Sequence, residues 1–176
     1  MKKMVIALAA VAFAAGVQAA TVKWSVSGIN GTDGNKAGNT YTAYVFCSYD
    51  SSSTFKTTTE AAALSAIASG SFADSLGNKS LTSGMIAAQT AGTIDVGTSP
   101  ETVKLFTIIV DSGNAHVLSV GEQTVVLENN SSTYTAKWTN VNNPAGDWAP
   151  ASVPEPTSGV LMLLGLAGLA LRRKNA

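Results

Sequence analysis

The amino-acid sequence predicts a mainly β protein, built as a single antiparallel β-sandwich of the jelly-roll or immunoglobulin-like kind with one short helix. Two observations predict this class. Short segments of alternating or continuous apolar residues recur at close spacing, and Gly- and Asn-rich turns separate them. One central segment has the three- and four-residue apolar spacing of a helix. An N-terminal signal peptide and a C-terminal transmembrane helix are expected to flank this domain.

The first expected strand covers residues 21–27. Val22, Trp24 and Val26 fall on one of its faces, and polar or charged residues fall on the other. This alternation is typical of a strand that is buried on one side only. Gly28 and the Asn- and Gly-rich loop behind it end the strand.

Two longer segments, residues 40–49 and 102–110, carry apolar or aromatic side chains on both faces. Strands of this composition lie in the middle of a sheet that is covered on both sides. A turn over residues 111–114 then leads to a return strand over residues 115–120. Further short strands are expected over residues 123–127 and 133–138.

One helix is expected between these strands. Thr57 and Glu60 have the spacing of a capping box, in which each side chain satisfies a free backbone N–H group. Leu64 and Ile67 follow at helical spacing, and Gly70 stands where a helix C-cap is expected.

The remaining central residues give weaker signals. Residues 71–101 are rich in Gly and Ser, and a second helical turn is expected over residues 85–89. The extracytoplasmic domain is expected over residues 21–139. Residues 140–152 are predicted to be a linker, because they contain Pro144, Gly146 and Pro150.

The N-terminus, residues 1–20, has the three parts of a secretory signal peptide. Lys2 and Lys3 are its positive region, and an apolar stretch follows. Small residues then provide a cleavage region at Ala19 and Ala20, with the cut after either of them. The predicted partners are therefore the Sec translocon and signal peptidase, and the protein is expected to cross the inner membrane.

The C-terminus, residues 153–176, has the pattern of a second targeting segment. The triplet Pro154, Glu155 and Pro156 precedes an apolar segment over residues 157–171, which is predicted to be a transmembrane helix. A basic cluster follows and is expected to stop transfer and stay on the cytoplasmic side. Its members are Arg172, Arg173 and Lys174.

This order of triplet, short apolar helix and basic end resembles a PEP-CTERM sorting signal of Gram-negative-type bacteria. The resemblance covers about the last 24 residues and implies processing by exosortase, a membrane-embedded, cysteine-dependent enzyme. It also implies that Pro154, Glu155 and Pro156 are the recognition element. Prolines support this, because they keep a segment extended and out of the helix. The alternative is a plain C-terminal membrane anchor.

Charge excludes some functions. Charged residues make up 12% of the chain, and eleven basic residues balance eleven acidic ones. No nucleic-acid partner is expected, because phosphate binding needs concentrated Lys and Arg. Residues 21–153 carry six Lys, no Arg and ten acidic residues, and 36 of these 133 residues are Ser or Thr. The exported part is thus mildly acidic and rich in hydroxyl groups.

No catalytic, cofactor-binding or metal-binding residue is predicted, and the protein is not expected to be an enzyme. His116 is the only histidine and is interpreted as structural. Cys47, the only cysteine, is expected to be buried, with intermolecular pairing as the alternative. Trp24 and Trp138 are assigned to the core. Trp148 is expected to be exposed in the linker, where its ring can stack on a glycan.

The predicted function is that of an exported structural or adhesive protein of the cell surface or extracellular matrix. The tail anchors it transiently in the inner membrane, and exosortase then sorts it. The resemblance further implies an association with exopolysaccharide. The alternative function is a secreted carbohydrate-binding module that uses surface aromatic residues.

Overall fold

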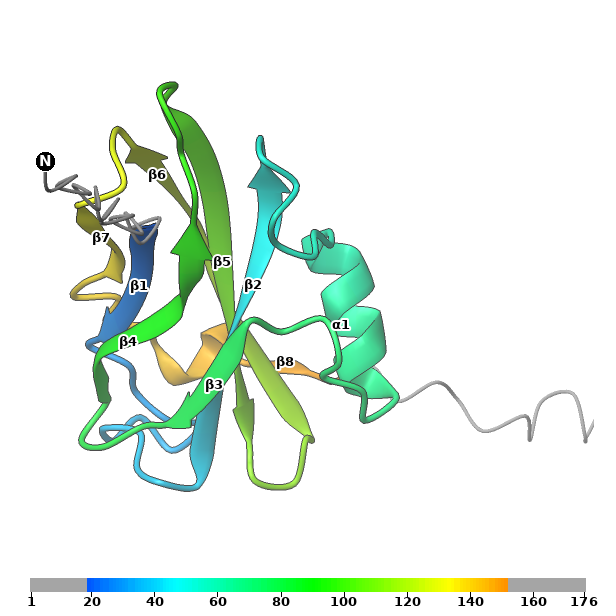
Figure 1. The fold of residues 1–176 in the computed structure, drawn as a ribbon. Coiled ribbons are helices and arrows are strands. Elements are labelled where there is room, and N and C mark those ends of the chain that lie inside the picture. The colour runs from blue at the N-terminus through cyan, green and yellow to red at the C-terminus, as the bar shows by residue number, and fades with distance from the viewer. Residues whose placement is uncertain (1–18, 152–176) are drawn as a thin grey trace, which may run out of the picture.

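The computed structural model describes residues 19–151, which form two β-sheets and one α-helix (Figure 1). The mainly β class predicted from the sequence is confirmed. A three-stranded sheet has the order β4-β1-β7, and a five-stranded sheet has the order β3-β2-β5-β6-β8. The elements are β1 (Ala20–Ser27), β2 (Tyr41–Asp50), α1 (Glu60–Ala68), β3 (Gly77–Ser80), β4 (Met85–Ile94), β5 (Glu101–Asp111), β6 (His116–Leu127), β7 (Thr133–Trp138), the 3₁₀ helix η1 (Ala145–Asp147) and β8 (Ala149–Pro150).

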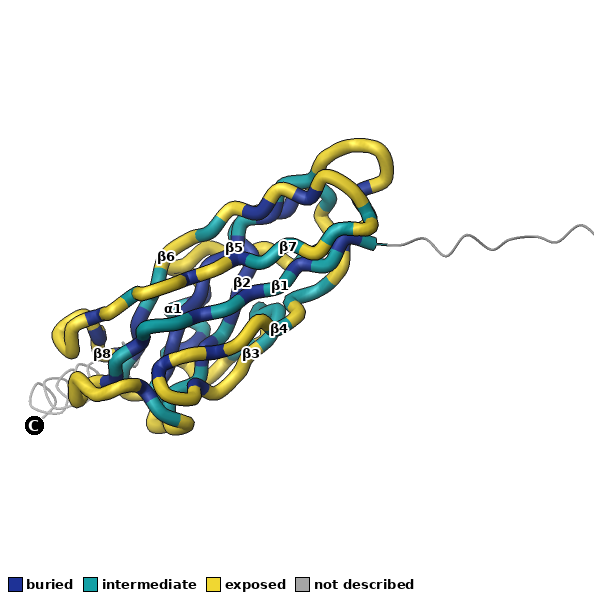
Figure 2. Tube along the Cα trace, turned by 90° about the vertical axis from the view of Figure 1, so that its left-hand side faces the viewer, coloured by how far each residue is buried: buried dark blue, intermediate teal, exposed yellow. Residues whose placement is uncertain are grey.

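Both sheets contribute to one large apolar core. Every second side chain of β1 is buried, as its alternating sequence predicts, and Trp24 is among the largest of them. The five-stranded sheet contributes Val45, Leu105 and Ile109 to the same cluster. In Figure 2, buried and half-buried positions alternate along β1. Burial of apolar surface on this scale is the main stabilising term of the fold.

A second, smaller core lies on the other side of the five-stranded sheet. Phe46 of β2 and Phe106 of β5 stack there with ring centroids 5.2 Å apart. Ala63 and Ile67 of α1 belong to the same buried cluster. Figure 1 shows α1 against this side of the sheet, away from β1, β4 and β7. The prediction that β2 and β5 are buried on both faces is therefore confirmed for the part of each strand that α1 covers.

The helix forms where the sequence predicts it, but its cap is different. Thr59 rather than Thr57 is the N-cap, and its hydroxyl accepts a hydrogen bond from the Ala62 N–H group. Gly70 has a φ of +76° just past the helix end. The N–H group of Gly70 donates to Ile67, and that of Ser71 donates to Ala66, which is the Schellman arrangement.

Two local predictions are wrong. Residues 85–89 belong to strand β4 and not to a helical turn, because β4 pairs along β1. Residues 115–120 and 123–127 are one continuous strand, β6, and not two. Gly121, with a φ of +84°, lies where the register between β5 and β6 shifts. A glycine at such a bulge bends a strand without ending it.

The sheets are not purely antiparallel, which corrects the predicted fold class. β1 pairs antiparallel with β4 but parallel with β7, from Thr21 opposite Thr133 to Val26 opposite Trp138. The reason is the route of the chain between the sheets. After β6, in the five-stranded sheet, the chain crosses to the three-stranded sheet and enters β7 beside β1, running in the same direction as β1.

The predicted linker is wrong as well, because residues 140–151 are tied to the body of the domain. We call them the closing strap. Val141 and Asn142 donate backbone hydrogen bonds to Ser27 and Gly28. The strap then forms η1 and ends in β8, which pairs with β6. It thereby joins the end of the three-stranded sheet to the edge of the five-stranded sheet, and the folded domain continues to residue 151.

No helix within residues 19–151 is long and apolar enough to span a membrane. The transmembrane helix predicted over residues 157–171 lies outside the described residues, as does most of the predicted signal peptide.

Candidate functional site

The residues predicted to direct sorting lie mostly outside the described part of the chain. This holds for the recognition triplet and for the basic stop cluster. What the structure provides is the point at which the folded domain meets each targeting segment. The residues outside are Pro154, Glu155, Pro156, Arg172, Arg173 and Lys174.

At the N-terminal junction, Ala20 is already the first residue of β1. Its side chain is fully buried, and it pairs with Ile94 of β4. The next residue, Thr21, donates its N–H group to the carbonyl of Ser132. A cut after Ala19 leaves this strand complete, whereas a cut after Ala20 removes a residue of the core. The folded domain therefore begins with no spacer behind the predicted cleavage region.

At the C-terminal junction, Trp148 is buried, with 7% of its surface exposed, and the prediction of an exposed ring is wrong. Its indole N–H group donates to the Asn30 carbonyl over 3.0 Å, and its ring packs against Tyr41 with centroids 5.1 Å apart. A ring enclosed in this way has no free face for a sugar. Trp148 fastens the closing strap to the core.

Asn143 is the second fastening of the strap. It is 2% exposed and makes three hydrogen bonds with Asn30. The Asn143 side chain accepts from the Asn30 N–H group over 2.9 Å and donates to the Asn30 carbonyl over 3.0 Å, and the Asn30 side chain donates to the Asn143 carbonyl over 2.9 Å. A buried amide with its hydrogen bonds made in this way fixes one geometry of the strap.

An exposed aromatic residue lies elsewhere, on the outer face of the five-stranded sheet. Tyr49 is 48% exposed, and Val126 on the same face is 46% exposed. Tyr49 pairs with Lys104 on β5, and Thr102 pairs with Val126 on β6. Two strand spacings, about 10 Å, separate β2 from β6 across β5. We call this surface the Tyr49 face, and it consists of Tyr49, Thr102, Lys104, Glu122, Thr124 and Val126.

The charges of the Tyr49 face balance each other. The Lys104 ammonium group lies 3.4 Å from a Glu122 carboxylate oxygen, and the Ser48 hydroxyl donates to the other oxygen. The hydrogen bond from Ser48 lowers the pKa of Glu122, burial opposes it, and the charge of Lys104 adds a further, smaller lowering. The face thus combines one exposed aromatic ring, polar groups with partners and no net charge. That combination suits a neutral, hydroxyl-bearing ligand.

His116 has a structural partner. Its Nδ1 atom lies 2.9 Å from a carboxylate oxygen of Asp111, across the turn between β5 and β6. Burial raises the pKa of Asp111, but the hydrogen bonds from His116 and Ala115 outweigh it and lower the pKa overall. The pair braces the turn.

Cys47 is fully buried in β2, as predicted. Burial raises the pKa of its thiol to about 11, so the thiolate form is suppressed. The thiol donates to the Tyr49 carbonyl.

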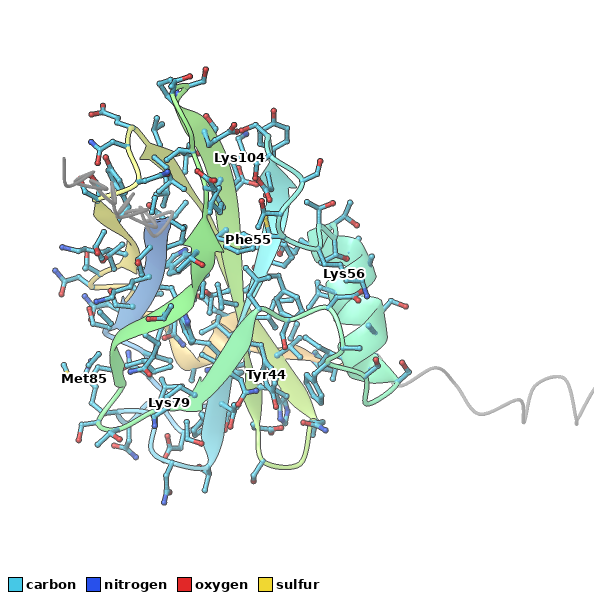
Figure 3. All side chains as sticks on the ribbon, viewed as in Figure 1. Tyr44, Phe55, Lys56, Lys79, Met85 and Lys104 are labelled. Atoms are coloured by element: carbon cyan, nitrogen blue, oxygen red, sulfur yellow. The ribbon has the colours of Figure 1, made fainter. Side chains whose placement is uncertain are left out.

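A shallow groove of about 370 Å³ opens between the edge strands β3 and β4. Lys79 and Met85 border it, and Figure 3 shows both at the same end of the molecule. Met85 is 53% exposed. The groove is also lined by hydroxyl groups, one amide and two apolar side chains, namely Ser80, Thr82, Ser83, Gln89, Ile86 and Ala87.

Comparison with known proteins identifies the tail. Residues 152–174 match the PEP-CTERM protein-sorting motif, so the chain is an exported protein with a C-terminal sorting signal. This motif indicates a protein that is sorted to the cell surface, with exosortase as its processing partner. The match begins at the residue after Ala151, where the closing strap ends. No curated protein and no solved structure matches the chain.

Proposed function

We propose that the domain over residues 20–151 is a non-catalytic structural or adhesive component of the cell surface or of an exopolysaccharide matrix. The observation that carries the proposal is the sorting motif, which follows directly on a folded β domain. The exported part is rich in hydroxyl groups and has no Arg, which supports a role in a hydrated polysaccharide layer. The two sheets around one core support a β-sandwich of mixed pairing.

The route of export is part of the same proposal. The chain crosses the inner membrane through the Sec translocon, and signal peptidase cuts it near Ala19. The tail over residues 157–171 then holds the protein transiently in the inner membrane. Arg172, Arg173 and Lys174 stay on the cytoplasmic side. Exosortase then recognises Pro154, Glu155 and Pro156 and separates the domain from the membrane.

Mass spectrometry of the protein from membranes and from the medium tests this route. The wild-type protein is expected to lose its tail and to leave the inner membrane. Simultaneous replacement of Pro154, Glu155 and Pro156 by Ala is expected to keep the full-length form in the membrane. Equal release of this variant and the wild type contradicts the route. A matched control replaces Thr98, Ser99 and Pro100 by Ala, three exposed residues of the loop between β4 and β5, and is expected to be released like the wild type.

A second candidate function is binding of a neutral polysaccharide through the Tyr49 face. It takes the place of stacking on Trp148, whose ring is enclosed. The exposed Tyr49 ring supports it, since the ring offers an apolar surface to the C–H groups of a sugar. A protein partner is less well suited, because a stable interface needs about 800 Å² on each side. Within the Tyr49 face, only Tyr49 and Val126 are large exposed apolar side chains.

Affinity electrophoresis through gels that contain dextran, hydroxyethyl cellulose or galactomannan tests the second candidate. Retardation is expected in at least one gel and is expected to be lost in Tyr49→Ala. Met85→Ala is the matched control, because it removes a similarly exposed side chain from the other sheet. Equal migration of Tyr49→Ala and the wild type in every gel rules the site out.

A further inference from the structure

The folded domain ends very close to the recognition triplet. Ala151 is buried and donates its N–H group to the Ala115 carbonyl over 2.9 Å. Only Ser152 and Val153 then separate it from Pro154. Three residue steps of fully extended chain cover about 10 Å. A domain of 133 residues has a radius of gyration of about 14 Å, so its body is wider than this gap.

This spacing opposes access by a membrane-embedded enzyme. The apolar tail begins at residue 157, six residue steps beyond Ala151, or about 20 Å of extended chain. The headgroup layer takes up part of that length. While the closing strap is docked, the domain therefore lies against the membrane surface and the enzyme at the point where the triplet has to enter the active site.

The closing strap has one weakly held part. Trp148 and Asn143 are buried and hydrogen-bonded, so they keep the strap in place up to residue 148. β8 beyond them has two residues, both exposed, and one of them, Pro150, has no N–H group to donate. Release of residues 149–151 lengthens the free chain by about 10 Å. Because Trp148 stays in place, this release leaves the large core intact and withdraws only the small side chain of Ala151 from the second core.

We propose that residues 149–151 form a release clip, and that the folded domain slows exosortase until this clip detaches from β6. The inference rests on the proposed processing by exosortase. The end of the domain around β8 and Ala115 is then the surface that faces the membrane and the enzyme. The occupant of that surface is exosortase with the lipid around it.

Insertion of flexible Gly-Ser segments of three, six and twelve residues between Ala151 and Ser152 tests the clip in the producing bacterium. The sorting motif stays intact, and the inserted chain supplies the length that clip release otherwise provides. Pulse–chase labelling is expected to show that the tail is removed roughly fivefold faster than in the wild type, because the few hydrogen bonds at β8 no longer have to break first. The rate is expected to reach a plateau at the longer insertions. Thermal unfolding of the purified domain is expected to be unchanged.

The matched control carries the same insertions between Thr98 and Ser99, in the exposed loop between β4 and β5, away from β8 and Ala115. It is expected to be processed at the wild-type rate. Equal rates for the insertions after Ala151 and the wild type overturn the release clip. The triplet variant separates the two proposals: if it is still processed, the exosortase route fails, and if it is blocked while the insertions have no effect, only the clip fails.

Discussion

The outer face of the five-stranded sheet has two halves that share the same strands and differ in their side chains. In one half, Phe46, Phe106 and Ile108 are buried beneath α1, each no more than 2% exposed. The other half is the Tyr49 face, where Tyr49 and Val126 are about half exposed. Lys104 and Phe106 are two positions apart on β5, and the boundary between the halves runs between them.

This difference shows that one strand can serve packing and an exposed surface at once. β5 runs through both halves. Its outward side chains are polar in the open half and aromatic in the covered half. Where they are apolar, the chain supplies a helix to cover them. Where they are polar or paired, the sheet is left open. The covered half is therefore expected to determine stability, and the open half to determine contacts with ligands.

Phe106→Ala tests the covered half and has the largest expected effect. The buried ring stacks on Phe46, and its removal leaves a cavity beneath α1. The free energy of unfolding is expected to fall by about 3–5 kcal/mol. Urea denaturation measures it. Val126→Ala on the same face is the control, and a comparable loss in that variant would remove the distinction between the halves.

Thr59→Ala weakens the cover itself. The Thr59 hydroxyl accepts from the Ala62 N–H group at the first turn of α1. Its loss is expected to lower the free energy of unfolding by about 1 kcal/mol. Thr57→Ala serves as the control, since the cap of the helix is Thr59. If Thr57→Ala is the more destabilising of the two, the capping geometry is wrong.

Tyr49→Ala tests the open half. The side chain is half exposed, so the change in unfolding free energy is expected to stay within about 0.5 kcal/mol. Thermal denaturation and affinity electrophoresis on the same sample separate stability from binding. A large loss of stability would show that Tyr49 is a packing residue.

Glu122→Gln is expected to have the smallest effect, of a few tenths of a kcal/mol, because the carboxylate is exposed and screened. The folded protein has a lowered pKa at Glu122, so ionised Glu122 stabilises the fold above the ordinary glutamate pKa of about 4.3. This contribution is lost as the pH falls through the lowered pKa. Urea denaturation is expected to show a difference between variant and wild type at pH 7 that shrinks as the pH falls through the lowered pKa. A difference that does not change with falling pH excludes the ionised carboxylate as its source.

The sequence predicted well the elements whose signal is local. The continuous apolar runs of β2 and β5 and the alternation in β1 reported their burial directly. β4 was missed because its Ala-rich sequence has no strand preference of its own, and pairing with β1 decides its structure. The direction of β7 depends on the path of the chain between the sheets, which no short pattern contains.

The closing strap was missed for a different reason. Its Pro, Gly and Asn residues are equally common in solvated linkers and in ordered, irregular backbone. Asn140 and Asn142 both have positive φ, which is a conformation that Asn tolerates. Trp148 was the signal available in the sequence, because a large aromatic residue in a polar stretch buries far more surface than a linker offers. For Tyr49, residue type alone did not reveal which face of β2 is uncovered.

The parallel pairing of β1 with β7 also governs when the protein can fold. The hydrogen bonds between Asn30 and Asn143 join residues 113 positions apart, and both neighbours of β1 follow it in the chain. Contacts between such distant residues form slowly, because a long loop has to close first. In the proposed route of export, β1 is the first strand to leave the translocon and has to wait for β7, so the three-stranded sheet is completed only after residues up to 138 have crossed. In that route the topology delays folding until most of the domain has crossed.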